Sequence, residues 1–239
     1  MMYGYGIGFS PSNRLFSGGG ANPLWDGLLA YYTADSTPND ALGTYNGTLV
    51  NGATYGTGII NQGFSLDGVN DYVDIGNNLD FDGTTSFSFS FWANPSDLTG
   101  INTLFRKYDT STVEGYVLFY NNGQLWFYLR GGSSSKLDVR TSSSYTTAMT
   151  YITLSYDGSR TPSGIKIYVD GISQTLVTIS NTLTSSTSNT ANFILSSGGG
   201  AGLNPFAGII DEFSIFNKEL TSTEVTELYN SGAGKQYPN

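Results

Sequence analysis

The 239-residue sequence contains no cysteine and no histidine, and these two absences remove several classes of chemistry. Without cysteine the chain can form neither disulfides nor thiolate nucleophiles. Without histidine it lacks the side chain that most often acts as a base near neutral pH. Zinc-finger sites, which use both residue types, are excluded as well. The sequence therefore indicates neither an oxidising nor a reducing compartment.

Charged residues are scarce too. They make up only 12% of the chain, and 10 basic against 19 acidic side chains give a net charge of −9. A phosphate-backbone partner needs clustered lysine and arginine, so nucleic-acid binding is not predicted. The absence of an apolar run of about 18 residues argues against membrane insertion. The first residues lack a positive segment followed by an apolar one, so no secretory signal is expected.

Aromatic residues and glycine are abundant instead, at 14% of the chain and 31 residues respectively. This mixture is typical of short strands joined by many turns. Segments with strand character recur with turn signals every 8–12 residues or so, which favours an all-β, two-sheet antiparallel sandwich. Its length suits one domain, predicted over residues 24–239.

The clearest strand lies at 86–95, where Phe87, Phe89 and Phe91 alternate with Ser88 and Ser90. Alternation places the three phenylalanines on one face of the strand. Further strands are predicted at 28–33, 149–157, 164–170, 173–179 and 191–197.

A hairpin is predicted at 115–131, because Asn122-Gly123 is a strong signal for a two-residue turn. The turn sets the register: Tyr120 faces Leu125 and Phe119 faces Trp126. One face of the hairpin is core-like, and we expect the other to line a groove. That second face carries Gln124, Trp126, Tyr128 and Arg130. Aromatic faces with a polar rim suit a sugar ring, so this set is a candidate ligand-binding platform; ordinary packing on the second sheet is the alternative.

Asp211 lies in a strand near the C-terminus, where period-two alternation groups it with Ile209, Phe213 and Ile215. A carboxylate on an apolar face must be paired, hydrogen-bonded or metal-bound. Two interpretations follow: a metal ligand, or a buried carboxylate satisfied by backbone N–H groups.

One short helix follows this strand. Thr221 and Glu224 have the spacing of a capping box, Leu220 and Val225 that of a hydrophobic staple, and Gly232 is a stop signal.

The segment 67–74 also resembles a calcium loop by composition, since it contains Asp67, Asn70, Asp71 and Asp74. Its spacing lacks the glycine and the final glutamate of an EF-hand. Turn chemistry is therefore the preferred interpretation.

Residues 1–23 form a predicted N-terminal arm with a flexible joint at the triple glycine 18–20. Its large apolar side chains, among them Tyr3, Ile7 and Phe16, are too many for a purely solvating tail. We expect the arm to dock onto another protein; a free tail is the alternative.

The order of these segments resembles the laminin-G-like jelly roll of the concanavalin A-like lectin/glucanase superfamily. The resemblance covers about residues 25–232 and is carried by GLLAYYTAD at 27–35, NGTLVNGATYGTG at 46–58, FSLDGVNDYVDIG at 64–76, SFSFSFWANP at 86–95, IKIYVDG at 165–171 and GIIDEFSIFNKELTSTEVTELYNSG at 208–232. It implies a jelly-roll sandwich that binds glycans or protein partners, often with a structural calcium ion. Carried onto this chain, the implied calcium ligands are Asp35, Asn46 and Asp211, which offer the oxygen atoms that calcium prefers.

Catalysis is not predicted. Glycoside hydrolysis needs two opposed carboxyl groups. The chain has only five glutamates, three of them at or in the predicted helix, and the Glu-x-Asp-x-Glu signature of the superfamily's glucanases is absent.

Three functions remain open. The first is a bacteriophage virion surface protein that displays a glycan-binding domain toward the host and docks onto other virion proteins through residues 1–23. The second is a secreted or cell-surface bacterial carbohydrate-binding or adhesion module. The third, disfavoured, is a glycoside hydrolase. Self-association into a homo-oligomer is left open.

Overall fold

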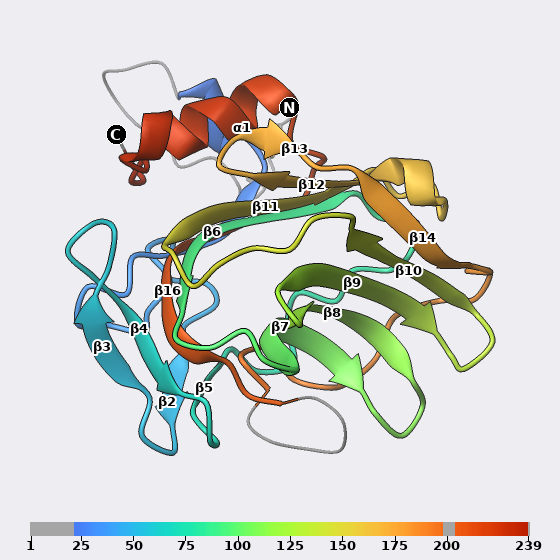
Figure 1. The fold of residues 1–239 in the computed structure, drawn as a ribbon, viewed down its shortest axis with the longest axis horizontal. Coiled ribbons are helices and arrows are strands. Elements are labelled where there is room, and N and C mark those ends of the chain that lie inside the picture. The colour runs from blue at the N-terminus through green and yellow to red at the C-terminus, as the bar shows by residue number, and fades with distance from the viewer. Residues whose placement is uncertain (1–21, 198–203, 239) are drawn as a thin grey trace, which may run out of the picture.

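The chain folds as two antiparallel β-sheets packed face to face, seen in a computed structural model that describes residues 22–197 and 204–238 (Figure 1). The predicted all-β jelly-roll sandwich is confirmed. Sheet A contains, in spatial order, β13 (Ile172–Ser173), β12 (Ile165–Val169), β11 (Thr150–Tyr156), β6 (Phe87–Pro95), β16 (Ala207–Phe216), β4 (Gln62–Asp67) and β3 (Thr54–Thr57), with β1 (Leu28–Tyr32) also paired to β16.

Sheet B is the second layer and is likewise eight-stranded. Its strands are, in spatial order, β14 (Leu176–Asn181), β10 (Lys136–Thr141), β9 (Gln124–Gly131), β8 (Glu114–Asn121), β7 (Ile101–Asp109), β15 (Ile194–Leu195), β5 (Tyr72–Asp74) and β2 (Thr48–Val50).

The main core lies between the sheets and is rich in aromatic rings. Strand β6 supplies Phe87, Phe89 and Phe91, all fully buried, as its alternation predicts. Phe89 packs against Phe105 of sheet B with ring centroids 4.4 Å apart. Such aromatic pairs stabilise the core by more than the burial of their apolar surface area alone would.

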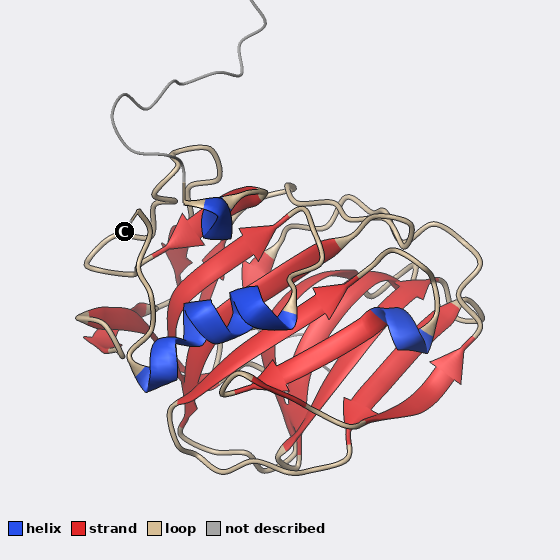
Figure 2. Ribbon diagram, turned by 90° about the horizontal axis from the view of Figure 1, so that it is seen from above, coloured by secondary structure: helices blue, strands red, loops and turns tan. Residues whose placement is uncertain are grey.

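A second apolar layer covers the outer face of sheet A. The helix α1 (Ser222–Tyr229) lies over this sheet, as Figure 2 shows from above, and buries Val225 and Leu228 against Trp92 of β6. The predicted capping box is present: the Thr221 hydroxyl accepts from the Glu224 N–H at 3.3 Å, and the Glu224 carboxylate accepts from the Thr221 N–H at 2.8 Å. The short 3₁₀ helices are η1 (Pro23–Trp25), η2 (Pro162–Gly164) and η3 (Asn230–Gly232).

Several sequence-based expectations differ from the structure, among them the strand predicted at 191–197, which is only β15 at 194–195. The segment 173–179 is not one strand: the chain passes from β13 in sheet A to β14 in sheet B within it. The helix ends earlier than Gly232, because Asn230 adopts a left-handed conformation with φ of 50°. Strands β2 (48–50), β3 (54–57), β7 and β10 were not predicted.

The alternation in β16 is also interrupted. Asp211 does not share a face with Phe213 and Ile215, because a β-bulge between 211 and 214, with Glu212 at φ of 50°, shifts the phase. Ile210, Phe213 and Ile215 therefore face the main core together.

Candidate functional site

The outer face of sheet B carries the predicted platform. The hairpin of β8 and β9 has the predicted register: Tyr120 pairs with Leu125 and Phe119 with Trp126. Its inner face joins the main core. Its outer face forms a separate apolar cluster that contains Val117 and Phe119, with Trp126 and Tyr128 partly buried against it. The structure thus brings the platform aromatics together on one surface.

Trp126 and Tyr128 remain partly exposed on this surface. Phe119 is buried and supports both rings, with its centroid 6.2 Å from Trp126 and 4.9 Å from Tyr128. The indole N–H of Trp126 has no hydrogen-bond partner among the described residues. Gln124 lies at the turn end of the same face, where its amide donates to the Ser142 carbonyl at 3.3 Å.

Arg130 closes the other end of the platform. Its guanidinium makes two hydrogen bonds to the Asp138 carboxylate, at 2.9 and 2.6 Å, and lies 3.7 Å from the centre of the Tyr128 ring. Burial opposes the charge on Arg130, but the hydrogen bonds and charge of Asp138 outweigh it and raise the pKa of Arg130. Such a bidentate pair holds the arginine in one geometry.

Two residues that contact the platform side chains were missed from the sequence, Asp138 and Arg140, both on β10. The guanidinium of Arg140 lies 5.8 Å from the centre of the Trp126 ring. The sequence does contain a signal for strand β10, because KLDVRT at 136–141 alternates polar and apolar side chains. Its partner strand could not be predicted, because the register across residues 132–135 depends on a loop rather than on a two-residue turn.

Asp211, the first predicted metal ligand, is fully buried and hydrogen-bonded to the backbone. Its Oδ2 accepts from the N–H groups of Ile59 at 2.8 Å and Ile60 at 3.2 Å, and its Oδ1 accepts from the Glu212 N–H at 2.8 Å. Burial raises the pKa of Asp211 to about 7, while these three N–H groups act in the opposite direction. Asp211 is thus a buried carboxylate satisfied by backbone N–H groups, which is the second of the two interpretations drawn from the sequence.

Asp35 and Asn46, the other two predicted ligands, are placed differently. Asp35 lies close enough to Asp211 to affect its titration, but its Oδ1 accepts from the Gln62 N–H at 3.0 Å. Asn46 is exposed in the loop before β2. The two aspartates thus face N–H donors instead of an open cation position, and the residues do not fit a calcium site as they stand. Within residues 22–197 and 204–238, no group of three or more acidic side chains is gathered for a metal ion. Calcium binding stays a prediction.

The segment 67–74 is a turn held by its own carboxylates. Asp67 Oδ1 accepts from the Val69 N–H at 2.8 Å, and Asp71 Oδ2 accepts from the Asp67 N–H at 3.1 Å. Asx-type contacts of this kind are ordinary turn chemistry.

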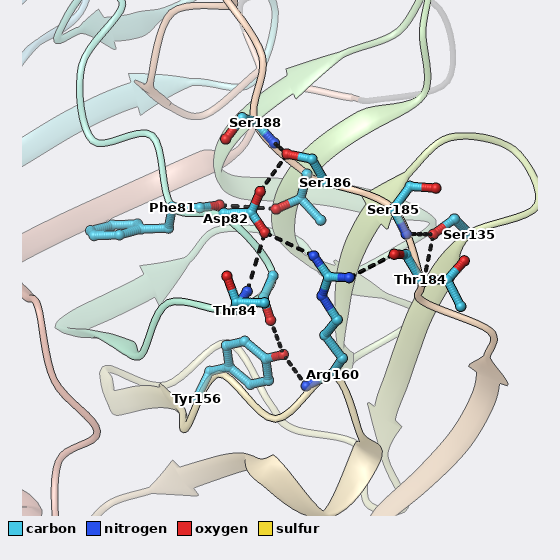
Figure 3. A network of polar contacts seen from close by, with 12 residues as sticks. Phe81, Asp82, Thr84, Ser135, Tyr156, Arg160, Thr184, Ser185, Ser186 and Ser188 are labelled. Carbon is cyan, nitrogen blue, oxygen red and sulfur yellow. Dashed lines mark hydrogen bonds and ion pairs between the residues drawn. The ribbon is translucent and has the colours of Figure 1, made fainter.

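A further polar cluster, shown in Figure 3, connects loops at one end of the sandwich. The Arg160 guanidinium contacts Asp82 at 3.2 Å and the Thr184 carbonyl at 2.6 Å, and the Ser186 hydroxyl donates to Asp82. Burial opposes ionisation of Asp82, but the hydrogen bonds from Ser186 and Arg160 prevail and hold its pKa below the ordinary value. Because these contacts join separate loops, the cluster has a structural role.

Comparison with solved structures finds the same fold in bacterial binding domains. The binding domain of Paraclostridial Mosquitocidal Protein 1 superposes with a TM-score of 0.70 at 21% identity, covering 87% of this chain and 53% of that one. The receptor binding domain of botulinum neurotoxin D gives 0.65 at 18% identity, covering 87% and 54%. This chain therefore spans about half the length of those two domains.

A third structure matches over nearly its whole length. Domain 4 of a GH43 extracellular arabinanase from Geobacillus stearothermophilus, solved in complex with arabinotriose, gives a TM-score of 0.61 at 24% identity, covering 84% of this chain and 97% of that one. No curated protein matches the sequence. None of the described helices is long and apolar enough to cross a membrane.

The sequence also matches a laminin-G-type family model over residues 67–226, which is more than half of the chain. This span includes both strands of the platform hairpin, the bulged strand β16 and most of α1. The fold, the order of the strands and this match agree, and the chain belongs to the concanavalin A-like lectin/glucanases superfamily.

Proposed function

We propose that the protein is a non-enzymatic, lectin-like module that binds a glycan on the outer face of sheet B. The observation that carries this proposal is the pair Trp126 and Tyr128, whose rings are partly exposed next to the polar side chains of Gln124 and Arg130. Aromatic faces provide apolar contact area for a sugar ring, and polar groups at their edge fix its orientation.

The comparisons support a binding role. Two of the similar structures are binding domains of bacterial toxins or toxin-like proteins, and the arabinanase domain was solved with arabinotriose. At identities below 25% these structures share only the fold with this chain. That this chain binds a sugar, as the arabinanase domain does, is therefore a hypothesis.

The positions of the glutamates support a non-enzymatic role. Glu219, Glu224 and Glu227 each form an ion pair with a lysine, at 2.5, 2.6 and 2.6 Å. Glu212 is buried. A glycosidase needs one carboxyl group on each side of the scissile bond. Release of reducing sugar from a polysaccharide panel by the purified protein would contradict the non-enzymatic proposal.

The Trp126→Ala variant tests the binding site. We expect it to weaken glycan-array binding at least about tenfold, because truncating a central aromatic anchor typically costs about 2 kcal/mol or more. Ile172→Ala is the control, since this side chain is 68% exposed at the edge of sheet A, away from the platform. Gln124→Ala removes one amide at the platform edge and should weaken binding without disturbing the apolar cluster. Full binding by folded variants at both platform positions would move the site to another surface.

The place of action is a separate proposal. We propose display on the surface of a bacteriophage virion, with export to the cell surface as the alternative. Protein inventories of purified particles, together with the neighbouring genes, decide between them. Sedimentation of the purified protein tests whether it forms a homo-oligomer.

A further inference from the structure

The outer face of sheet B is positively charged, although the whole protein carries a net charge of −9. Cross-strand pairing places Lys136 opposite Arg130, and Arg140 opposite Trp126. Residues directly opposite each other in neighbouring strands share a face. The positively charged strand residues of this face are Arg106, Arg130, Lys136 and Arg140, and the negatively charged ones are Asp74 and Asp138. Four positive and two negative charges leave the face at +2.

Arg106 extends this positive face away from the platform. It pairs with Val117, which in turn pairs with Tyr128. The row of facing residues continues across the sheet, in spatial order Ser180, Asp138, Tyr128, Val117, Arg106, Ile194, Asp74 and Thr48. Two strand spacings separate Arg106 from Tyr128, which is about 10 Å.

Arg106 lines a hollow of about 260 Å³ together with Tyr72, Asp74, Asn192 and Ile194. Its guanidinium donates to the carbonyl oxygens of Tyr108 and Ser197, both at 3.0 Å. Its Nε has no hydrogen-bond partner, and its charge has no ion-pair partner, among the residues that the structure describes. The two carbonyls therefore hold a cation in place without neutralising it.

Asp74 is the acidic group in the same hollow, and it is already engaged. Its carboxylate accepts from the Asn192 amide at 3.0 Å on both oxygens and from the Gly76 N–H at 2.8 Å. These neutral donors hold Asp74 in place without removing its charge, so Asp74 and Arg106 are two opposite charges in the hollow with no ion pair between them among the described residues. The positive surplus therefore belongs to the face as a whole.

We infer that the outer face of sheet B binds an acidic polysaccharide, with Arg106 contacting a carboxylate or sulfate on one sugar while Trp126 and Tyr128 contact a neighbouring one. This inference rests on the proposed glycan-binding function and adds the ligand class. A hollow of this size holds one charged group with part of its ring. Arginine recognises carboxylate and sulfate groups through its fixed fork of N–H donors. Arg140, beside Trp126, provides a second positive contact.

The test compares each acidic polymer with its own neutral form. The full chain is titrated with polygalacturonate, alginate and hyaluronan, each in the native state and after chemical reduction of its carboxylates to hydroxymethyl groups. We expect binding to the native polymers that falls at least about tenfold after reduction and weakens as salt rises. Arg106→Gln should weaken binding to the native polymer about tenfold and leave binding to the reduced polymer unchanged.

Two further variants keep the result interpretable. Arg140→Gln, which loses one hydrogen bond to the Thr141 carbonyl, should act in the same direction if Arg106→Gln fails to fold. Lys166→Gln is the control, since it removes the same charge from an exposed site on sheet A. Equal binding of native and reduced polymers, with both arginine variants like wild type, would overturn the acidic-ligand inference and leave the glycan-binding proposal intact. Binding to neither form would also overturn the acidic-ligand inference, and absence of any signal on the glycan array would be the separate result that overturns the glycan-binding proposal.

Discussion

Glu212 is buried in β16 beside Asp211, and its Oε2 has no hydrogen-bond partner among the described residues. Burial raises the pKa of Glu212 to about 8, only partly offset by a hydrogen bond from the Gln236 amide at 3.2 Å. The unfolded chain binds this proton only below its ordinary pKa of about 4.5. Between these two values the native state holds a proton that the unfolded state has lost, so the free energy of unfolding falls as pH rises through this window.

The variant Glu212→Gln tests this account. It should be more stable than wild type by about 1–3 kcal/mol at pH 8, because the uncharged amide avoids the cost of a buried, partly unsatisfied carboxylate. Toward pH 5 the difference should shrink, since wild-type Glu212 is then protonated in the native state. Urea melts at both pH values measure this, with Glu227→Gln at an exposed ion pair as the control. A difference that stays constant from pH 5 to pH 8 would contradict the proposed ionisation.

Asp211 allows a test of calcium at the same scale. If the carboxylate served as a calcium ligand, added calcium would stabilise the native state by mass action and Asp211→Ala would abolish that gain. The three backbone N–H contacts give the residue a structural role without the ion. We therefore expect Asp211→Ala to lower the melting temperature in chelator as well as in calcium. A wild-type melting temperature that rises with calcium, with a gain that Asp211→Ala abolishes, would instead support calcium binding at this carboxylate.

At the scale of elements, the sequence predicts best where local rules determine the geometry. The Asn122-Gly123 turn determines the hairpin register, and period-two alternation determines which side of β6 enters the core. Both predictions depend on residues close together in the sequence, so they could be made without knowledge of tertiary contacts. The capping box of α1 succeeds for the same reason.

The failures occur where distant contacts decide. The bulge in β16 requires Glu212 at positive φ, which no local residue preference announces, and it moved Asp211 to the other face of its strand. The order of the strands in sheet B brings Arg106 into one row with Tyr128, and that order cannot be obtained from spacing along the chain. The platform aromatics and Arg130 were thus predictable, while Arg106, Lys136 and Arg140 were not.

At the scale of the whole molecule, the two outer faces of the sandwich differ. The helix α1 and the segment around η1 cover sheet A with apolar contacts that include Trp92 and Leu24. The outer face of sheet B instead carries its own small apolar cluster with partly exposed rings and a surplus of positive charge. The outer face of sheet A is therefore covered by the chain itself, and the outer face of sheet B is the candidate binding surface (Figure 1 shows the two sheets).

The predicted docking arm, residues 1–23, lies outside the described residues except for its last two. In the described domain the aromatic core is already closed, since Phe87, Phe89 and Phe91 are fully buried. We therefore predict that deleting residues 2–20 lowers the stability of the sandwich by less than about 1 kcal/mol, a change in melting temperature of about 2–4 °C at most. Glycan binding at Trp126 should be retained.

The same deletion should abolish incorporation into particles if the protein is displayed on a virion. The apolar side chains of the arm, such as Tyr3, Ile7 and Phe16, would then be buried against a partner, at an ordering cost of about 2–5 kcal/mol that the apolar contacts offset. Thermal melts, glycan binding and particle proteomics on one deletion variant separate these roles. Strong destabilisation would show that the arm is part of the sandwich, and normal incorporation would show that the particle contact lies elsewhere, because the segment that was removed is the one predicted to make it.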